Sequence, residues 1–186
     1  MTKINYSSSF LIPLAIILAG IFVSLGIFFS DKLVLKTNPL SQKSEENFKP
    51  VIGSYAPLFT LKTSRQTEIN LEDLRGQNIL LVFWNTGCDY SVKELSDLKE
   101  FTDLYRGQII VLAINIKELS QTVREYEEKE KINFTMLLDE DGAIAQKYQI
   151  DGTPYHFMIN KEGKIVAIWP FYASLENLKY LAERLN

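Results

Sequence analysis

The segment from Asn78 to Trp84 reads NILLVFW, an apolar run of the length of one buried strand. Cys88, the only cysteine, follows four residues later. Apolar residues then recur at three- and four-residue steps, ending near Gly107; they are Val92, Leu95, Leu98, Phe101, Leu104 and Tyr105. That spacing predicts a helix with one buried face. A buried strand that leads directly into an amphipathic helix is typical of an α/β domain.

The same alternation continues along the chain and then changes. We expect buried strands at 109–115 and 134–138, a helix that opens with Ser120 as its N-cap, and a short helix within 139–148. Residues 155–169 predict two strands joined by a hairpin turn at 161–163, and a last amphipathic helix runs from Ser174. Two segments before Asn78 look like a short extended pair, at 56–61 and 67–74. The sheet must therefore be mixed, with helices on both faces.

Composition excludes several classes of function. The chain has 186 residues, a net charge of −3 and a pI of about 5.3, so it offers no basic surface to a phosphate backbone and we expect no nucleic-acid partner. One cysteine cannot form an intramolecular disulfide. With a single histidine besides, no Cys/His cluster is available for zinc, and we expect neither a metal nor a cofactor.

A run of 20 residues without a charge, Phe10–Phe29, predicts a membrane anchor. At about 1.5 Å per residue, a helix of this length spans the roughly 30 Å hydrocarbon core. The alternative is a cleaved signal peptide, but the run is longer than a usual signal core and no A-x-A-like site follows it. We therefore divide the chain into a short segment 1–9, an anchor 10–29, a polar linker 30–49 and a folded domain 50–186. Flanking lysines do not decide the orientation.

Four segments carry a family resemblance, in the order GSYAPLFTL (53–61), LEDLRGQNILLVFW (71–84), ILLVFWNTGCDYSVKEL (79–95) and GTPYHFMINKEGKIV (152–166). Together with the preceding apolar span, they resemble the thioredoxin fold. The resemblance is specifically to its membrane-anchored TlpA/ResA-like branch of thiol-disulfide oxidoreductases, which is related to the AhpC/TSA redoxins. It covers about Val51 to Asn186. The resemblance implies a thioredoxin-like domain that exchanges thiols with other proteins.

The resemblance also assigns roles around Cys88. Family members usually read Trp-Cys-x-x-Cys, so Cys88 matches the attacking cysteine, Ser91 replaces the resolving one, and Gly87 stands where an aromatic residue is usual. The family places its first cysteine at a helix N-terminus, where free N–H groups and the dipole favour a thiolate. We expect Asp89 and Glu94 to oppose that ionisation, and the direction of the net shift stays open.

Several neighbours have two interpretations each. Glu94 matches an acidic position of this branch, as a proton acceptor or pKa modulator, or else it is a surface glutamate near a helix start. Ser91 either donates a hydrogen bond to a Cys88 thiolate or is a neutral helix-start residue. Trp84 matches a residue expected chiefly to pack. Tyr90 either partly replaces the aromatic ring that is missing at Gly87 or contacts a partner. No Pro-x-x-x-Thr-x-x-Cys motif precedes Cys88, because Thr86 lies two residues before it and no proline is nearby, so the peroxide site of peroxiredoxins is not reproduced.

Thr153 and Pro154 match the cis-proline loop that faces the active cysteine in this family and offers its backbone to an extended peptide. His156 lies two residues further along the same predicted strand and so on the same face. It is either a base for Cys88 or a half-buried histidine with its own hydrogen-bond partners, and we favour the second interpretation.

Two functions follow from the missing second thiol. In the first, the protein is a membrane-anchored monothiol oxidoreductase whose Cys88 attacks protein thiols or disulfides, in cytochrome maturation or another envelope redox process, with its domain outside the cytoplasm. In the second, it is a redox-inactive module that docks extended peptides. The sequence leaves open whether Cys88 turns over, since Ser91 cannot release a mixed disulfide.

Overall fold

The structure is a computed structural model, and it describes residues 50–185. The predicted anchor at Phe10–Phe29 and the linker at 30–49 lie outside these residues and stay predictions. Within the described part of the chain, no helix has both the length and the apolar composition needed to cross a membrane.

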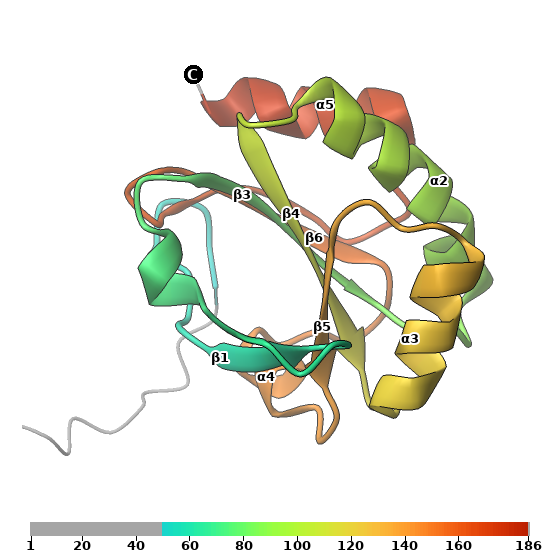
Figure 1. The fold of residues 1–186 in the computed structure, drawn as a ribbon. Helices are drawn as coiled ribbons and strands as arrows, with labels where there is room; N and C mark the ends of the chain where they lie inside the picture. The colour runs from blue at the N-terminus through green and yellow to red at the C-terminus, as the bar shows by residue number, and fades with distance from the viewer. Residues whose placement is uncertain (1–49, 186) are drawn as a thin grey trace, which may run out of the picture. The chain divides into compact units, whose positions relative to one another are not determined.

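Residues 50–185 contain one seven-stranded sheet, in the order β2-β1-β5-β4-β3-β6-β7 (Figure 1). Its strands are β1 (Thr60–Thr63), β2 (Glu68–Asn70), β3 (Asn78–Trp84), β4 (Ile109–Ile116), β5 (Thr135–Asp139), β6 (Tyr155–Ile159) and β7 (Ile165–Trp169). Strand β4 pairs in parallel with β3 and β5, whereas β6 is antiparallel to both β3 and β7. The predicted mixed sheet is confirmed.

The central strand β3 is buried on both sides, because its alternating side chains enter two separate cores. Leu80, Val82 and Trp84 pack into one core together with helices α2 (Asp89–Leu104), α3 (Ser120–Lys129) and α5 (Leu175–Ala182). Ile79, Leu81 and Phe83 pack into the other core, with α4 (Ala143–Lys147) and the 3-10 turn η2 (Leu71–Leu74).

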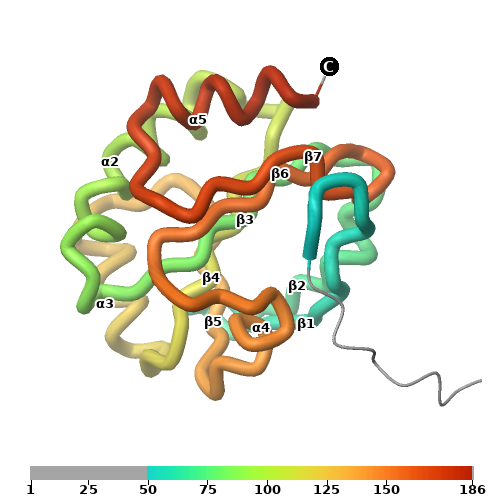
Figure 2. The backbone as a smooth tube through the Cα atoms, turned by 180° about the vertical axis from the view of Figure 1, so that it is seen from behind, coloured from blue at the N-terminus to red at the C-terminus, as the bar shows by residue number. Residues whose placement is uncertain are grey.

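Helices therefore cover both faces of the sheet, as predicted. Figure 1 shows α2, α3 and α5 together and α4 below the sheet beside β1, and Figure 2 shows the same layers from behind. The described residues end in a short 3-10 turn, η3 (Glu183–Leu185). A short loop, 85–88, joins the end of β3 to the start of α2 and lies at the rim of the sheet.

Three local predictions were wrong. Leu104 is 51% exposed, and the buried face of α2 includes Ser91 and Glu94 instead. Leu119, not Ser120, is the N-cap of α3, and it makes no side-chain capping bond. The second extended segment ends in η2, because the Asn70 side chain accepts from the amide of Glu72 and starts a 3-10 turn there. Ser174, in contrast, caps α5 through a reciprocal capping box with Asn177.

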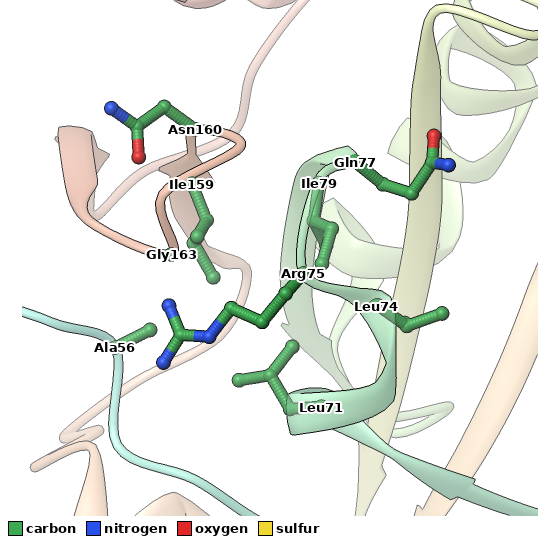
Figure 3. Close-up of a pocket in the computed structure, with 9 residues that line it drawn as sticks. All are labelled: Ala56, Leu71, Leu74, Arg75, Gln77, Ile79, Ile159, Asn160 and Gly163. Carbon is green, nitrogen blue, oxygen red and sulfur yellow. The ribbon is translucent and has the colours of Figure 1, made fainter.

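A small apolar cavity lies far from the rim, between η2, the start of β3 and the β6–β7 hairpin (Figure 3). Arg75 closes it, and its guanidinium donates to the carbonyl oxygen of Glu162 at 2.6 Å. The remaining lining is Ala56, Leu71, Leu74, Gln77, Ile79, Ile159, Asn160 and Gly163. No nucleophilic side chain lines this cavity, so it contributes packing of the hairpin rather than chemistry.

Candidate active site

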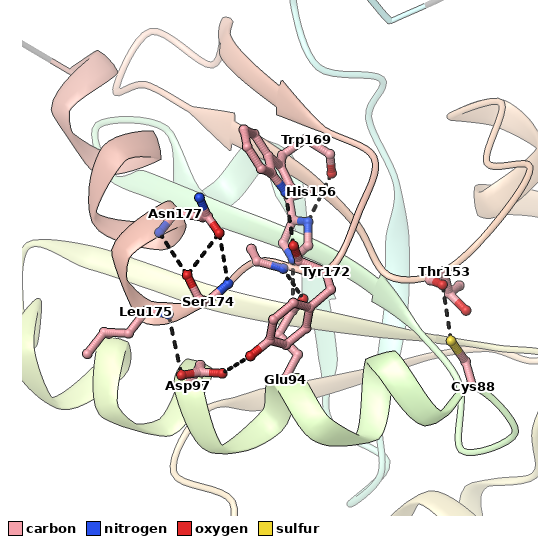
Figure 4. Close-up of polar contacts among 11 residues, drawn as sticks. Cys88, Glu94, Asp97, Thr153, His156, Trp169, Tyr172, Ser174, Leu175 and Asn177 are labelled. Atoms are coloured by element: carbon pink, nitrogen blue, oxygen red, sulfur yellow. Dashed lines mark hydrogen bonds and ion pairs between the residues drawn. The ribbon is translucent and has the colours of Figure 1, made fainter.

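Cys88 is the N-cap residue of α2, directly after the loop that leaves β3. Its carbonyl oxygen accepts from the amide of Val92 at 3.0 Å, so the helix starts at this residue. Its thiol donates to the carbonyl oxygen of Thr153 at 3.1 Å, and Figure 4 shows the two residues facing each other from separate elements. The Thr153–Pro154 peptide bond is cis. The predicted pairing of Cys88 with a cis-proline loop is confirmed.

The environment of Cys88 lowers the pKa of its thiol below the ordinary value. Partial burial raises that pKa. Hydrogen bonding lowers it by more, and the donors are the Ser91 hydroxyl, the Ser91 amide, the Thr153 side chain and the Tyr90 amide. Neither Asp89 nor Glu94 is among the causes, so the expected opposition from these carboxylates is not found. The net shift, which the sequence left open, favours the thiolate.

Ser91 is buried on the inner face of α2, one turn after Cys88. Its hydroxyl has no hydrogen-bond partner while Cys88 is a protonated thiol, so its proton is free to rotate toward the sulfur once the thiol ionises. Among the groups that lower the pKa of Cys88, this hydroxyl has the largest effect. The first of its two predicted interpretations, a donor to the thiolate, agrees with this placement.

We predict that Ser91→Ala reduces alkylation of Cys88 by iodoacetamide near neutral pH about fivefold. The reason is that a lost hydrogen bond to a charged atom costs about 1 kcal/mol of thiolate stability. The measurement is the alkylation rate of the single thiol as a function of pH. Ser96→Ala is the matched control, since the Ser96 hydroxyl donates to the Lys93 carbonyl further along the same helix. An unchanged rate in the Ser91 variant would exclude this role.

The two aromatic candidates differ in exposure. Trp84 is buried and packs against the ring of Tyr126 at 5.7 Å, which supports a packing role. Its indole Nε1 has no hydrogen-bond partner. Tyr90 is 64% exposed, and its ring lies 6.4 Å from that of Tyr172, so it is available to a partner molecule.

Glu94 and His156 are both fully buried and in contact with each other. Nε2 of His156 lies 2.5 Å from Oε1 of Glu94, and Oε2 of Glu94 accepts from the amide of Ala173 at 2.7 Å (Figure 4). The interpretation of Glu94 as a surface glutamate is therefore wrong. His156 has its own partners, as favoured from the sequence, but it is fully rather than half buried, because β6 is an inner strand.

A carboxylate that the sequence did not single out holds the loop before Cys88. Glu118 accepts from the amide of Thr86 at 3.0 Å, from the Thr86 hydroxyl, and from Nδ2 of Asn115 at 2.5 Å. Asn115 is the register partner of Trp84, so the end of β4 lies beside the end of β3. Polar residues that follow two adjacent parallel strands are a signal that could have indicated this contact.

An open groove runs beside Thr153 along the same rim. Its lining comes from the loop after β3, the end of β4, the α4 region and the loop before Pro154, and includes Asn85, Lys117, Gln146, Asp151, Gly152 and Thr153. It is therefore continuous with the loop whose carbonyl oxygen contacts Cys88.

Comparison with known proteins gives a consistent result. The sequence model of the AhpC/TSA family matches residues 52–168. Thiol-disulfide oxidoreductase ResA of Bacillus subtilis (strain 168) is 32% identical over 117 residues, which are 62% of this chain and 65% of that protein. ResA of Geobacillus thermodenitrificans is 29% identical over 136 residues, or 73% of this chain and 78% of that protein.

Solved structures show the same fold. A putative thiol:disulfide interchange protein DsbE from Chlorobium tepidum superimposes with a TM-score of 0.68 at 20% identity, over 74% of this chain and 100% of that one. StoA from Bacillus subtilis gives a TM-score of 0.60 at 25% identity, over 68% of this chain and 96% of the other. The described domain therefore has a thioredoxin-like fold.

Proposed function

Because this chain belongs to the AhpC/TSA family, we propose that it is a thiol-disulfide oxidoreductase of the ResA type that works through one active-site cysteine. The observation that carries this proposal is the position of the Cys88 thiol. It is partly exposed at the start of α2, its pKa is lowered, and it contacts the carbonyl of Thr153 before the cis-proline. A buried, inert cysteine would show none of these features.

The proposed chemistry is two successive thiol-disulfide exchanges. The Cys88 thiolate attacks one sulfur of a substrate disulfide, so that a Cys88 mixed disulfide forms and the other substrate sulfur leaves as a thiolate. A second thiol, either an external one or another cysteine of the substrate, then attacks the mixed disulfide and releases Cys88 as a thiolate. Ser91 cannot perform this step. The electrons for any net reduction therefore come from the second thiol.

The loop at Thr153 supports a protein substrate. Once Cys88 has lost its proton it no longer donates to the Thr153 carbonyl oxygen, which becomes free to accept from the backbone of an incoming chain. The adjoining groove continues past Asp151 toward α4 and gives an extended segment a path. Exposed Tyr90, two residues after Cys88 at the start of α2, can contact the same segment.

The wider setting of this activity is also part of the proposal. Residues 10–29 anchor the protein in a membrane by one span, and the domain lies outside the cytoplasm. Its partners are protein thiols or disulfides there, such as those of cytochrome maturation or envelope redox control. The uncharged composition of Phe10–Phe29 and the family resemblance support these points.

The test is formation of a reducible adduct by the full-length protein. We expect incubation with glutathione disulfide to add one glutathionyl group to the parent protein, seen by intact mass and removed by dithiothreitol. We expect no adduct on Cys88→Ser. In a second arm, the parent but not the variant retains proteins from an envelope extract as dithiothreitol-sensitive complexes. If the parent forms no adduct and both proteins retain the same partners, the binding-module function is correct instead.

A further inference from the structure

The exchange chemistry proposed above makes no use of the buried contact between α2 and β6. Glu94 comes from the helix that starts at Cys88, and His156 comes from the strand that starts after Pro154. Both side chains are 0% exposed. A buried ionisable pair is costly unless its charges and hydrogen bonds are matched, so its protonation state is fixed by its contacts.

The contacts of the imidazole determine where its hydrogens lie. Nδ1 of His156 is 2.9 Å from the carbonyl oxygen of Trp169 (Figure 4). A carbonyl oxygen only accepts hydrogen bonds, so Nδ1 must carry a hydrogen. A neutral imidazole with its hydrogen on Nδ1 has only a lone pair on Nε2. That lone pair would face Oε1 of Glu94 at 2.5 Å.

The contacts of the Glu94 carboxyl group determine whether a hydrogen lies between Glu94 and His156. Oε2 of Glu94 accepts from the amide of Ala173 at 2.7 Å, so Oε1, which faces Nε2 of His156, is the oxygen placed to share a hydrogen with the imidazole. An ionised Glu94 next to a neutral imidazole would then place two lone pairs against each other at 2.5 Å, inside the molecule and away from water. Two such atoms in hydrogen-bond contact need a hydrogen between them.

We infer that Glu94 and His156 hold one proton between Oε1 and Nε2, so that the pair is neutral as a unit and Glu94 does not oppose the ionisation of Cys88. His156 is thus a positioning residue for the site and has no contact with the sulfur. The effect on Cys88 reactivity rests on the proposed function, whereas the shared proton follows from the contacts of Glu94 and His156 alone.

No other charged group near the pair neutralises Glu94. Asp97, one turn further along α2, accepts from the Tyr172 hydroxyl at 2.9 Å and from the amide of Leu175. Lys93 lies over the ring of Tyr172 at 4.8 Å, outside the buried contact. Strands β3, β6 and β7 carry no charged residue besides His156 itself. His156 is therefore the group that offsets the charge of Glu94.

The consequence for Cys88 follows from distance. Glu94 is six residues after Cys88, about 9 Å along a helix axis. A full negative charge at that separation, at an effective dielectric constant of about 20 to 40, would reduce the thiolate fraction about tenfold.

The first test uses the unmodified full-length protein, because His156 is the only histidine in the chain. Nitrogen-15 spectra of the labelled imidazole and carbon-13 spectra of the Glu94 carboxyl group are recorded near neutral pH. We expect either an imidazolium with a carboxylate or a neutral imidazole with a carboxylic acid. A neutral imidazole together with a carboxylate would overturn the inference.

The second test is Glu94→Gln, whose amide can donate to Nε2 and whose oxygen can accept from Ala173. We expect the alkylation rate of Cys88 near neutral pH to stay within about twofold of the parent, because one neutral unit replaces another. A rate about tenfold higher would show that Glu94 carries an uncompensated charge, and would overturn the inference. Glu100→Gln, an exposed glutamate on the same helix, is the control. Neither test requires catalytic turnover, so both results can be interpreted even if the proposed function is wrong.

Discussion

Replacing Ser91 by cysteine should accelerate release of a Cys88 mixed disulfide about 100-fold or more in the absence of added thiol. Residues three apart at the start of an α-helix have Cα atoms about 5 Å apart, which lies within the range that a disulfide bridges. Cys88 and Ser91 have this relation at the first turn of α2. A second thiol at position 91 attacks within the molecule, at an effective concentration far above that of millimolar external thiol.

The measurement starts from protein already carrying a glutathionyl group on Cys88 and follows the appearance of free glutathione. The parent should retain its adduct, and Ser91→Cys should lose it with formation of an intramolecular disulfide. Ser96→Cys is the matched control, because this exposed position lies eight residues after Cys88 and cannot reach its sulfur. Retention of the adduct in the Ser91 variant would mean that the side chain at 91 does not lie beside Cys88.

The fold could be predicted from local patterns because its central strands are uninterrupted apolar runs. Asn78–Trp84 is a strand with the predicted bounds, and the second run, predicted at 109–115, extends by one residue to Ile116. Local capping was less predictable. Ser120 is a favourable N-cap residue, yet α3 already includes it, since the loop after β4 sets where the helix begins. Position in the fold overrode the local preference.

The site was predictable where one segment carries it and not where two segments meet. Cys88 and the Thr153–Pro154 loop were expected to face each other because of the family resemblance, and they do. The contact between Glu94 and His156 joins residues 62 positions apart, so no spacing rule indicates it. One local signal was available: Ser91, Glu94 and Leu98 follow the three- and four-residue steps of a single helix face. Polar residues on a buried face indicate a functional or paired group.

Glu94→Ala should lower the free energy of unfolding by about 3–5 kcal/mol, the largest effect on stability that we expect of a polar substitution here. It leaves Nε2 of His156 buried without an acceptor and removes the acceptor of the Ala173 amide. The whole stability of a domain of this size is on the order of 5–15 kcal/mol, so the variant should approach the limit of folding at room temperature.

The loss of stability in Glu94→Ala should come from leaving His156 buried without its partner, rather than from losing the attraction between the two side chains. A second variant separates these two causes. Replacing both residues, as Glu94→Leu with His156→Leu, removes the whole pair and should cost less than Glu94→Ala alone, since the Ala173 amide and the Trp169 carbonyl lose a partner but no ionisable group is left buried. Urea unfolding followed by fluorescence of the two tryptophans compares the three proteins. A double variant less stable than the single one would mean that the pair itself stabilises the domain. Its role would then be structural, with no need for the neutral charge inferred above.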